Sequence, residues 1–109
     1  MNERILRVNQ LIRTELGKII NEELEFPGII VTVTAVHTAK DLRNANIYIS
    51  VIPDGKTGTV LKKLEANKKN FHQLLNKNMV IRNVPRLRFV VDKSGKKAAE
   101  MDLFLDNLQ

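Results

Sequence analysis

The sequence has no cysteine, no tryptophan and only three prolines among its 109 residues. The absence of cysteine excludes disulfide bridges and thiolate metal sites, so nothing in the chain needs an oxidising compartment. No apolar run approaches the roughly 18 residues of a membrane span, and the charged N-terminal stretch MNERILRVNQ does not resemble a signal peptide. We therefore expect a cytoplasmic protein that has no membrane partner and folds around one modest core.

Side chains that carry out catalysis or hold metals are also scarce. The only histidines are His37 and His72, and neither has a second histidine nearby at metal-ligand spacing. Ser50 and Ser94 lack the sequence context of an activated nucleophile. The sequence therefore predicts a protein that is not an enzyme, holds no metal or cofactor and has no small-molecule substrate. Both histidines are interpreted as structural or surface groups.

The formal net charge of +6 is distributed unevenly along the chain. Residues 1–54 contain six Lys or Arg and seven Asp or Glu, whereas residues 55–109 contain twelve and five. A positive half of this kind is the electrostatic footprint of a protein that binds nucleic acid. The alternative from charge alone is a lysine-rich surface that only keeps the protein soluble.

The spacing of apolar residues predicts a helix followed by two strands. Apolar residues recur three and four positions apart over residues 4–24, which is typical of one buried helix face. The sequence Phe26-Pro27-Gly28 should end this helix, and Gly17 inside it is interpreted as a close packing contact. Two alternating, β-branched segments at residues 29–38 and 45–52 predict strands, the second with one face buried and the other largely in water.

A second helical region begins near Thr57 or Thr59, either of which is a candidate N-cap. Its apolar residues are interrupted by the polar stretch EANKKN, residues 65–70. This interruption is compatible with one long helix that has a weak apolar stripe. We favour two helices that meet at a kink near Ala66–Lys69.

The third strand is expected in two parts, residues 79–82 and residues 86–92. Pro85 lies between them, and because it cannot donate to a sheet ladder it belongs at a strand start, an edge or a bulge. In the second part, Arg86 and Arg88 alternate with apolar residues and should point together, away from the core. The order of elements predicts a small α+β domain, with a mixed three-stranded sheet backed on one face by helices.

The segment PDGKTG, residues 53–58, has features of two phosphate-binding motifs and satisfies neither. A Walker A loop requires a glycine where this chain has Ser50, within a predicted strand. The Gly-x-x-Gly turn of RNA-binding KH modules joins two helices, whereas Gly55-Lys56-Thr57-Gly58 joins a strand to a helix. We interpret the segment as a turn and a helix start.

Basic residues of the second half are the candidate ligands for RNA phosphates. Lysine ammonium groups suit non-specific phosphate contact, and arginine side chains grip phosphate with two hydrogen bonds. Because aromatic residues are few, four Phe and one Tyr, a base-stacking platform for single strands is disfavoured and recognition of structured RNA by backbone and shape is expected. The predicted RNA-binding residues are Lys62, Lys63, Lys68, Lys69, Lys77, Arg82, Arg86 and Arg88.

Two segments carry a resemblance to a known family: VTVTAVHTAKDLRNANIYISV, residues 31–51, and IRNVPRLRFVVDKS, residues 81–94. They resemble ribosome-binding factor A, a family of assembly factors of the small ribosomal subunit, and the resemblance extends from about Arg4 to Ser94. Its most specific features, at their spacing, are Asp41-Leu42, Ala45, Arg82, Val84-Pro85, Leu87, Phe89 and Asp92.

The resemblance implies an α+β, KH-like fold of type II topology, α-β-β-α-α-β, whose three-stranded sheet is backed by helices with no Gly-x-x-Gly between them. We expect this domain at residues 1–95 and a short C-terminal tail at residues 96–109, where an apolar stripe is typical of a short helix. The resemblance also implies a monomer that binds free small (30S) ribosomal subunits or their precursors and contacts 16S rRNA. The implied role is non-catalytic help in late maturation and processing of 16S rRNA, with a part in cold adaptation. A KH-like module that acts on other structured RNA is the alternative.

The chain departs from the family pattern at two positions. Family members commonly bend the second helical region at an Ala-x-Gly-like sequence, where this chain has Ala66-Asn67-Lys68. The residue after Pro85 is often acidic in the family, and here it is Arg86, which makes this face more basic. Asp41 and Asp92 are interpreted as structural residues in turns or caps.

Overall fold

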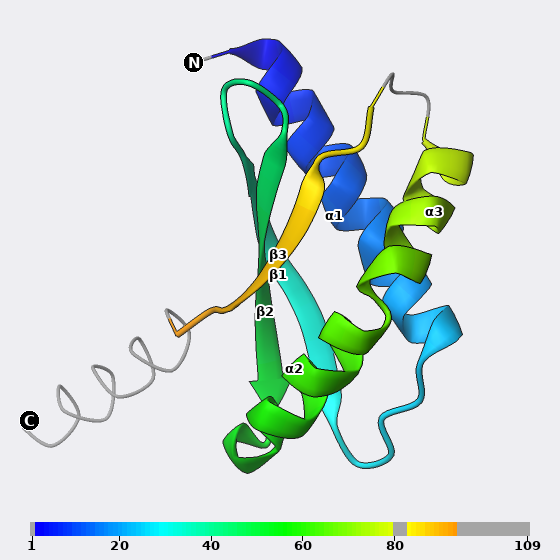
Figure 1. Ribbon diagram of the computed structural model, residues 1–109. Coiled ribbons are helices and arrows are strands. Elements are labelled where there is room, and N and C mark those ends of the chain that lie inside the picture. The colour runs from blue at the N-terminus through cyan, green and yellow to red at the C-terminus, as the bar shows by residue number, and fades with distance from the viewer. Residues whose placement is uncertain (1, 80–82, 94–109) are drawn as a thin grey trace, which may run out of the picture.

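The computed structural model describes residues 2–79 and 83–93. Its elements follow in the order α1 (Glu3–Glu23), β1 (Ile30–Thr38), β2 (Asn44–Ile52), the short 3-10 turn η1 (Asp54–Lys56), α2 (Thr57–Ala66), α3 (Lys68–Asn78) and β3 (Arg86–Val91). The three strands form one sheet, and the helices lie together on one side of it (Figure 1). The expected α-β-β-α-α-β order and the KH-like α+β fold class are confirmed.

Helix α1 begins and ends at residues that suit helix termini. Asn2 caps it, because the Asn2 side-chain oxygen accepts a hydrogen bond from the backbone N–H of Arg4 at 2.9 Å. The helix ends at Glu23, and Gly28 then adopts a left-handed φ of 72° in the turn that leads into β1. The predicted apolar stripe is buried at Val8, Ile12, Leu16, Ile19 and Ile20.

The sheet is mixed, with β2 at its centre. Strands β1 and β2 pair antiparallel, and the register shifts between Val33 and Ala35, which leaves Thr34 in a bulge. Strand β3 pairs parallel with the other side of β2 and is therefore an edge strand. A parallel neighbour cannot be reached through a hairpin, so α2 and α3 form the necessary crossover.

Alternation along the strands separates a buried face from an open one. In β2, every second residue from Ala45 to Val51 is buried against the helices. In β3, Phe89 is buried whereas Arg86 and Arg88 are exposed, as the alternation predicts. Phe89 meets Phe71 of α3 edge-on, with ring centroids 6.2 Å apart. This contact ties the edge strand to the crossover helices.

Helices α2 and α3 meet at the expected kink, which is centred on Asn67. The Asn67 backbone has φ −103° and ψ 5°, and glycine is not needed there because φ is negative. The Asn67 side-chain amide donates to the carbonyl of Lys63 at 2.8 Å, and its own carbonyl accepts from the N–H of Phe71 at 2.9 Å. Asparagine thus closes α2 and opens α3, so the bend forms without an Ala-x-Gly sequence.

Two local expectations are wrong. Neither Thr57 nor Thr59 is the N-cap of α2, because η1 leads directly into the helix and Lys56 occupies the cap position. The Thr57 hydroxyl instead donates to the Asp54 carbonyl at 2.7 Å. Gly17 makes no close packing contact, since apart from its chain neighbours and the backbone of its own helix no atom lies within 4 Å of the position that its Cβ would take.

The expected first part of the third strand is only partly described. Met79 is the C-cap of α3 and not a strand residue, while residues 80–82 lie outside the described residues. The predicted helical stripe of the C-terminal tail, between residues 96 and 109, also lies outside them. Pro85 immediately precedes β3, which confirms its expected place at a strand start.

Replacement of Gly17 by alanine should stabilise the protein by about 1 kcal/mol, because glycine is unfavourable inside a helix and the added methyl group meets no atom. This corresponds to a rise in Tm of roughly 4 to 8 °C, measured by thermal unfolding. Gly28→Ala is the matched control: its Cβ is equally free, but φ is +72°, so it should destabilise by about 1 kcal/mol. A lower Tm for Gly17→Ala would show that this position needs glycine.

Replacement of Asn67 by alanine should lower the free energy of unfolding by about 0.5 to 1.5 kcal/mol, because the Lys63 carbonyl loses its side-chain donor. Urea unfolding followed by circular dichroism measures this loss. The exposed Asn70, in the first turn of α3, provides the control, since Asn70→Ala removes the same side chain away from the kink. Equal stability of the two variants would mean that the Asn67 amide does not hold the bend.

Candidate nucleic-acid interface

A broad concave surface lies where four segments of the chain converge. It is lined by the first half of α1, the β1–β2 loop, the α2–α3 kink and the segment that leads into β3. Its volume is about 1750 Å³, larger than the roughly 300 to 1000 Å³ of a small-molecule site. We call this surface the groove, and its size suits a macromolecular ligand.

The groove is predominantly basic. Three carboxylates line it, from Glu3, Asp41 and Glu65. Against them stand six cationic side chains: Arg4, Arg7, Arg43, Lys68, Lys69 and Arg86. A concave wall lined by one sign of charge concentrates the electrostatic field and attracts ligands of the opposite sign. Phosphate groups of a nucleic acid are the anions that such a surface fits best.

Half of these cations come from the part of the chain that has no net positive charge. Arg4 and Arg7 lie on α1, and Arg43 lies in the β1–β2 loop, so counting charges along the sequence missed all three. One signal was present: Arg4, Arg7 and Leu11 are spaced three and four apart, which places them on one helix face. All three residues line the groove.

Hydrogen bonds donated by backbone N–H groups hold the loop side of the groove in place. Asp41 accepts from the N–H of Arg43 at 3.0 Å, which confirms its expected role in a turn. The N–H of Arg86 donates to the Arg43 carbonyl at 2.8 Å and joins the start of β3 to this loop. Asn9 of α1 accepts from the N–H of Thr38 at 2.9 Å, at the end of β1. The guanidinium groups of Arg43 and Arg86 therefore extend from a braced backbone.

The helical side of the groove is held by His72. One ring nitrogen of His72 lies 3.0 Å from the Val84 carbonyl, and the other lies 3.2 Å from the side-chain amide of Asn76. Val84 and Pro85 are both buried. His72 thus fastens the segment before β3 to α3, and its expected structural role is confirmed.

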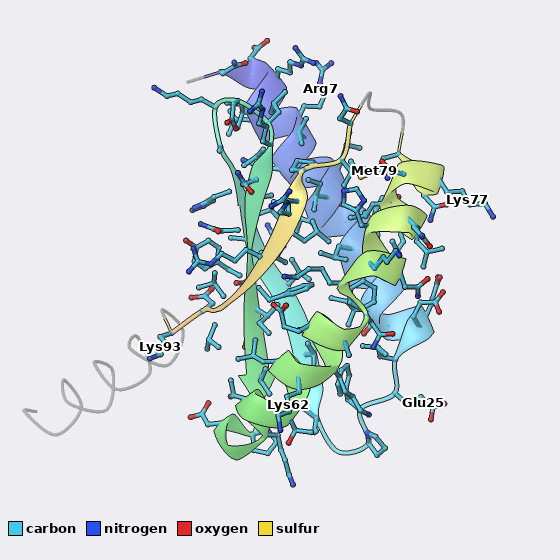
Figure 2. The ribbon with its side chains drawn as sticks, in the orientation of Figure 1. Arg7, Glu25, Lys62, Lys77, Met79 and Lys93 are labelled. Carbon is cyan, nitrogen blue, oxygen red and sulfur yellow. The ribbon has the colours of Figure 1, made fainter. Side chains whose placement is uncertain are left out.

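The structure separates the eight predicted RNA-binding residues. Lys68, Lys69 and Arg86 line the groove, and Lys68 also pairs with Glu65 at 2.8 Å. Lys62 and Lys77 are exposed but lie outside the groove lining, and in Figure 2 Lys62 and Arg7 lie at opposite ends of the domain. Arg82 falls outside the described residues.

Two further predicted contacts have other surroundings. Lys63 donates to the Glu25 carbonyl at 3.3 Å and sits 5.3 Å from the centroid of the Phe26 ring, so it braces the α1–β1 connection. Arg88 is exposed on the face of the sheet that the helices leave uncovered. The predicted basic residues in the described part of the chain therefore do not form one continuous surface over α2, α3 and β3.

Metal clusters and membrane-spanning helices are absent from the described part of the chain. Residues 2–79 and 83–93 contain no group of three or more His, Asp or Glu side chains that could hold a metal ion. Over the same ranges, no helix combines the length and the apolar character that a membrane crossing requires. The segment PDGKTG forms η1 and the first turn of α2 and lies outside the groove lining, which confirms its interpretation as a turn and a helix start.

The model of the ribosome-binding factor A family matches residues 4–105 of this chain. The chain belongs to the ribosome-binding factor A family. A family member from Akkermansia muciniphila is 32% identical over 108 residues, which cover 99% of this chain and 86% of the relative. Another, from Agathobacter rectalis, is 34% identical over 106 residues, covering 94% and 88%.

Solved structures of ribosome-binding factor A share the fold. The crystal structure of the Thermus thermophilus protein has a TM-score of 0.72 at 22% identity, with 83% of this chain and 97% of that chain covered. A homology model of the Thermus thermophilus protein, fitted into the cryo-EM map of a complex of the 30S subunit with ribosome-binding factor A, has a TM-score of 0.58 at 25% identity, covering 76% and 93%. The family resemblance predicted from the sequence is therefore confirmed.

Proposed function

We propose that this protein is a non-catalytic assembly factor that binds free small ribosomal subunits, or their precursors, through the groove. The observation that carries the proposal is the convergence of six cationic side chains from four segments on one concave surface. Membership of the ribosome-binding factor A family supports the choice of ligand, and so does the related protein fitted with the 30S subunit. A cytoplasmic location is part of the same proposal, because the ligand is a ribosomal subunit.

The proposed contacts are to the phosphate backbone of 16S rRNA. Arg43 and Arg86 extend from a hydrogen-bonded backbone. Each planar guanidinium can grip a phosphate with two hydrogen bonds, so less side-chain freedom is lost per hydrogen bond formed. Lys68 and Lys69 lie at the kink, on flexible stems that tolerate differences in phosphate position. Binding of this kind recognises the shape of a folded RNA and not its base sequence.

Binding of the protein to 16S rRNA, without any catalysis, is sufficient to influence ribosome assembly. A protein bound to folded 16S rRNA stabilises the RNA arrangement that it fits by the free energy of binding. We propose that this holds the late precursor until maturation and processing of 16S rRNA are complete, and that the need for it grows in the cold. The domain that does this spans residues 1–95, with residues 96–109 as a tail.

Sedimentation of cell lysate through a sucrose gradient, with the protein followed by immunoblot, tests the proposal. We expect the protein to migrate with free small subunits and to be absent from translating ribosomes. Raising the salt from 50 to 200 mM should release it, because each phosphate contact displaces counterions from the RNA and added salt therefore weakens binding in proportion to the number of contacts. A protein that stays at the top of the gradient at both salt concentrations would refute subunit binding, and tight binding to isolated RNA would then favour a module for other structured RNA.

Charge reversal within the groove should weaken binding to purified small subunits. The variant Lys68→Glu/Lys69→Glu/Arg86→Glu removes three phosphate contacts. The negative slope of log K, the association constant, against log salt concentration should therefore become shallower by about 3. The control Lys56→Glu/Lys62→Glu/Lys77→Glu changes the net charge equally at exposed sites outside the groove, and its slope should change by less than about 1. Equal losses in the two variants would mean that net charge and not the groove governs binding.

The contribution of the acidic half of the sequence can be tested separately. Arg7→Glu/Arg43→Glu alters two groove residues that the chain-wise charge pattern does not single out. We expect a fall of about 2 in the same salt slope, with the thermal unfolding profile unchanged. Unaltered binding by the folded variant would confine the interface to the second half of the chain.

A further inference from the structure

The face of the sheet opposite the helices carries an ordered set of side chains that the groove does not use. Across the three strands, His37 pairs with Asn46, and Asn46 pairs with Arg88. In the next row, Tyr48 lies between Ala35 and Val90. The two rows lie on the open face, where Figure 1 shows no helix.

The two rings in these rows are in contact. The centroids of His37 and Tyr48 are 5.0 Å apart, and the ring planes are tilted by 59°. His37 is exposed and Tyr48 is half-buried. Each ring therefore exposes part of its surface to solvent, while the Cα end of each side chain is fixed in the sheet. The sequence shows too few aromatic residues for a platform of several bases, but the register of β1 and β2 brings one ring pair together. One pair of rings offers enough aromatic surface to contact a single RNA base.

The charge on this face is positive. The three strands contain no Asp or Glu, and Arg86 and Arg88 both extend from β3. Asp92, just after β3, accepts a hydrogen bond from the Thr34 hydroxyl in the bulge. Neighbouring strands are about 4.8 Å apart, so the row from His37 through Asn46 to Arg88 spans roughly 10 Å. An aromatic ring, an amide and a guanidinium therefore lie within the reach of one nucleotide.

We propose that this open face binds one unpaired nucleotide of an RNA strand. The base stacks on the Tyr48 ring and, because the two ring planes are tilted by 59°, contacts the His37 ring edge-on. The Asn46 amide hydrogen-bonds to the base edge, and the Arg88 guanidinium binds the adjoining phosphate. These are the contacts by which proteins hold single-stranded RNA. This inference rests on the proposed function, since it adds a second contact to the same RNA.

The position of β3 connects the two surfaces. Arg86 lines the groove, and Arg88 lies two residues farther along the same edge strand, on the open face. An RNA strand that leaves the groove at Arg86 therefore meets Arg88 next, with no other strand between them. A protein partner fits this face less well, because the centre of a protein interface is usually depleted of charge and rich in large apolar residues. Here the large exposed apolar residues, Ile30 and Ile52, pair at the opposite end of the strands.

Binding of a short single-stranded RNA that carries one 2-aminopurine tests the inference, because the emission of this base falls when it stacks. The probe is titrated with the full chain and with two matched pairs: Tyr48→Leu against Tyr48→Phe, and His37→Thr against His37→Tyr. The second member of each pair keeps an aromatic ring. We expect quenching with the wild type and both aromatic variants, and about tenfold weaker binding with Tyr48→Leu and His37→Thr.

Co-sedimentation of each variant with small subunits separates this inference from the proposed function. Equal quenching by all variants, or no quenching by the wild type, overturns the nucleotide site even if every variant still binds subunits. Weaker subunit binding by Tyr48→Leu without any quenching by the wild type also overturns it, because the face would then contact a protein. Failure of the wild type itself to bind subunits refutes the proposed function. If Tyr48→Leu does not fold, the exposed His37 pair still decides the matter.

Discussion

The parallel pairing of β3 with β2 is the constraint on which the rest of the structure depends. Because β3 runs in the same direction as β2, the chain must return along the sheet through α2 and α3 before β3 can begin. The segment before β3 therefore arrives at the end where β2 starts, and the N–H of Arg86 bonds to the Arg43 carbonyl there. The groove exists because this return places four separate segments side by side.

The bend at Asn67 determines what the crossover helices bring to that place. Core residues lie on both sides of the bend, Val60 in α2 and Phe71 in α3, while Lys68 and Lys69, just after it, line the groove. Hydrogen bonds of Asn67 to Lys63 and from Phe71 make the break without a glycine. His72 then joins α3 to Val84, so the kink, the helix and the start of β3 form one side of the groove.

The arrangement of charge matters more for the proposed function than the net charge. Of the eight basic residues singled out from the sequence, three line the groove, while Lys63 is engaged with Glu25 and Phe26, and Arg88 lies outside the groove on the open face of the sheet. Arg4, Arg7 and Arg43 complete the groove although their half of the chain has no positive excess. Together with the open face around Tyr48, this distribution fits an RNA that runs along the edge strand β3 from Arg86 to Arg88.

The sequence by itself determined the helices and strands, because each is encoded by a local pattern of apolar residues. These patterns are the apolar stripe of α1, the alternation of β2 and β3, and the polar interruption that becomes the kink. It also carried the family motif between Asp41 and Asp92. Only the tertiary structure decided which side chains share a surface, such as Arg7 with Lys69, or His37 with Tyr48. Local periodicity depends on neighbours a few positions away, whereas these groupings depend on strand register and on the crossover, which join residues far apart in the chain.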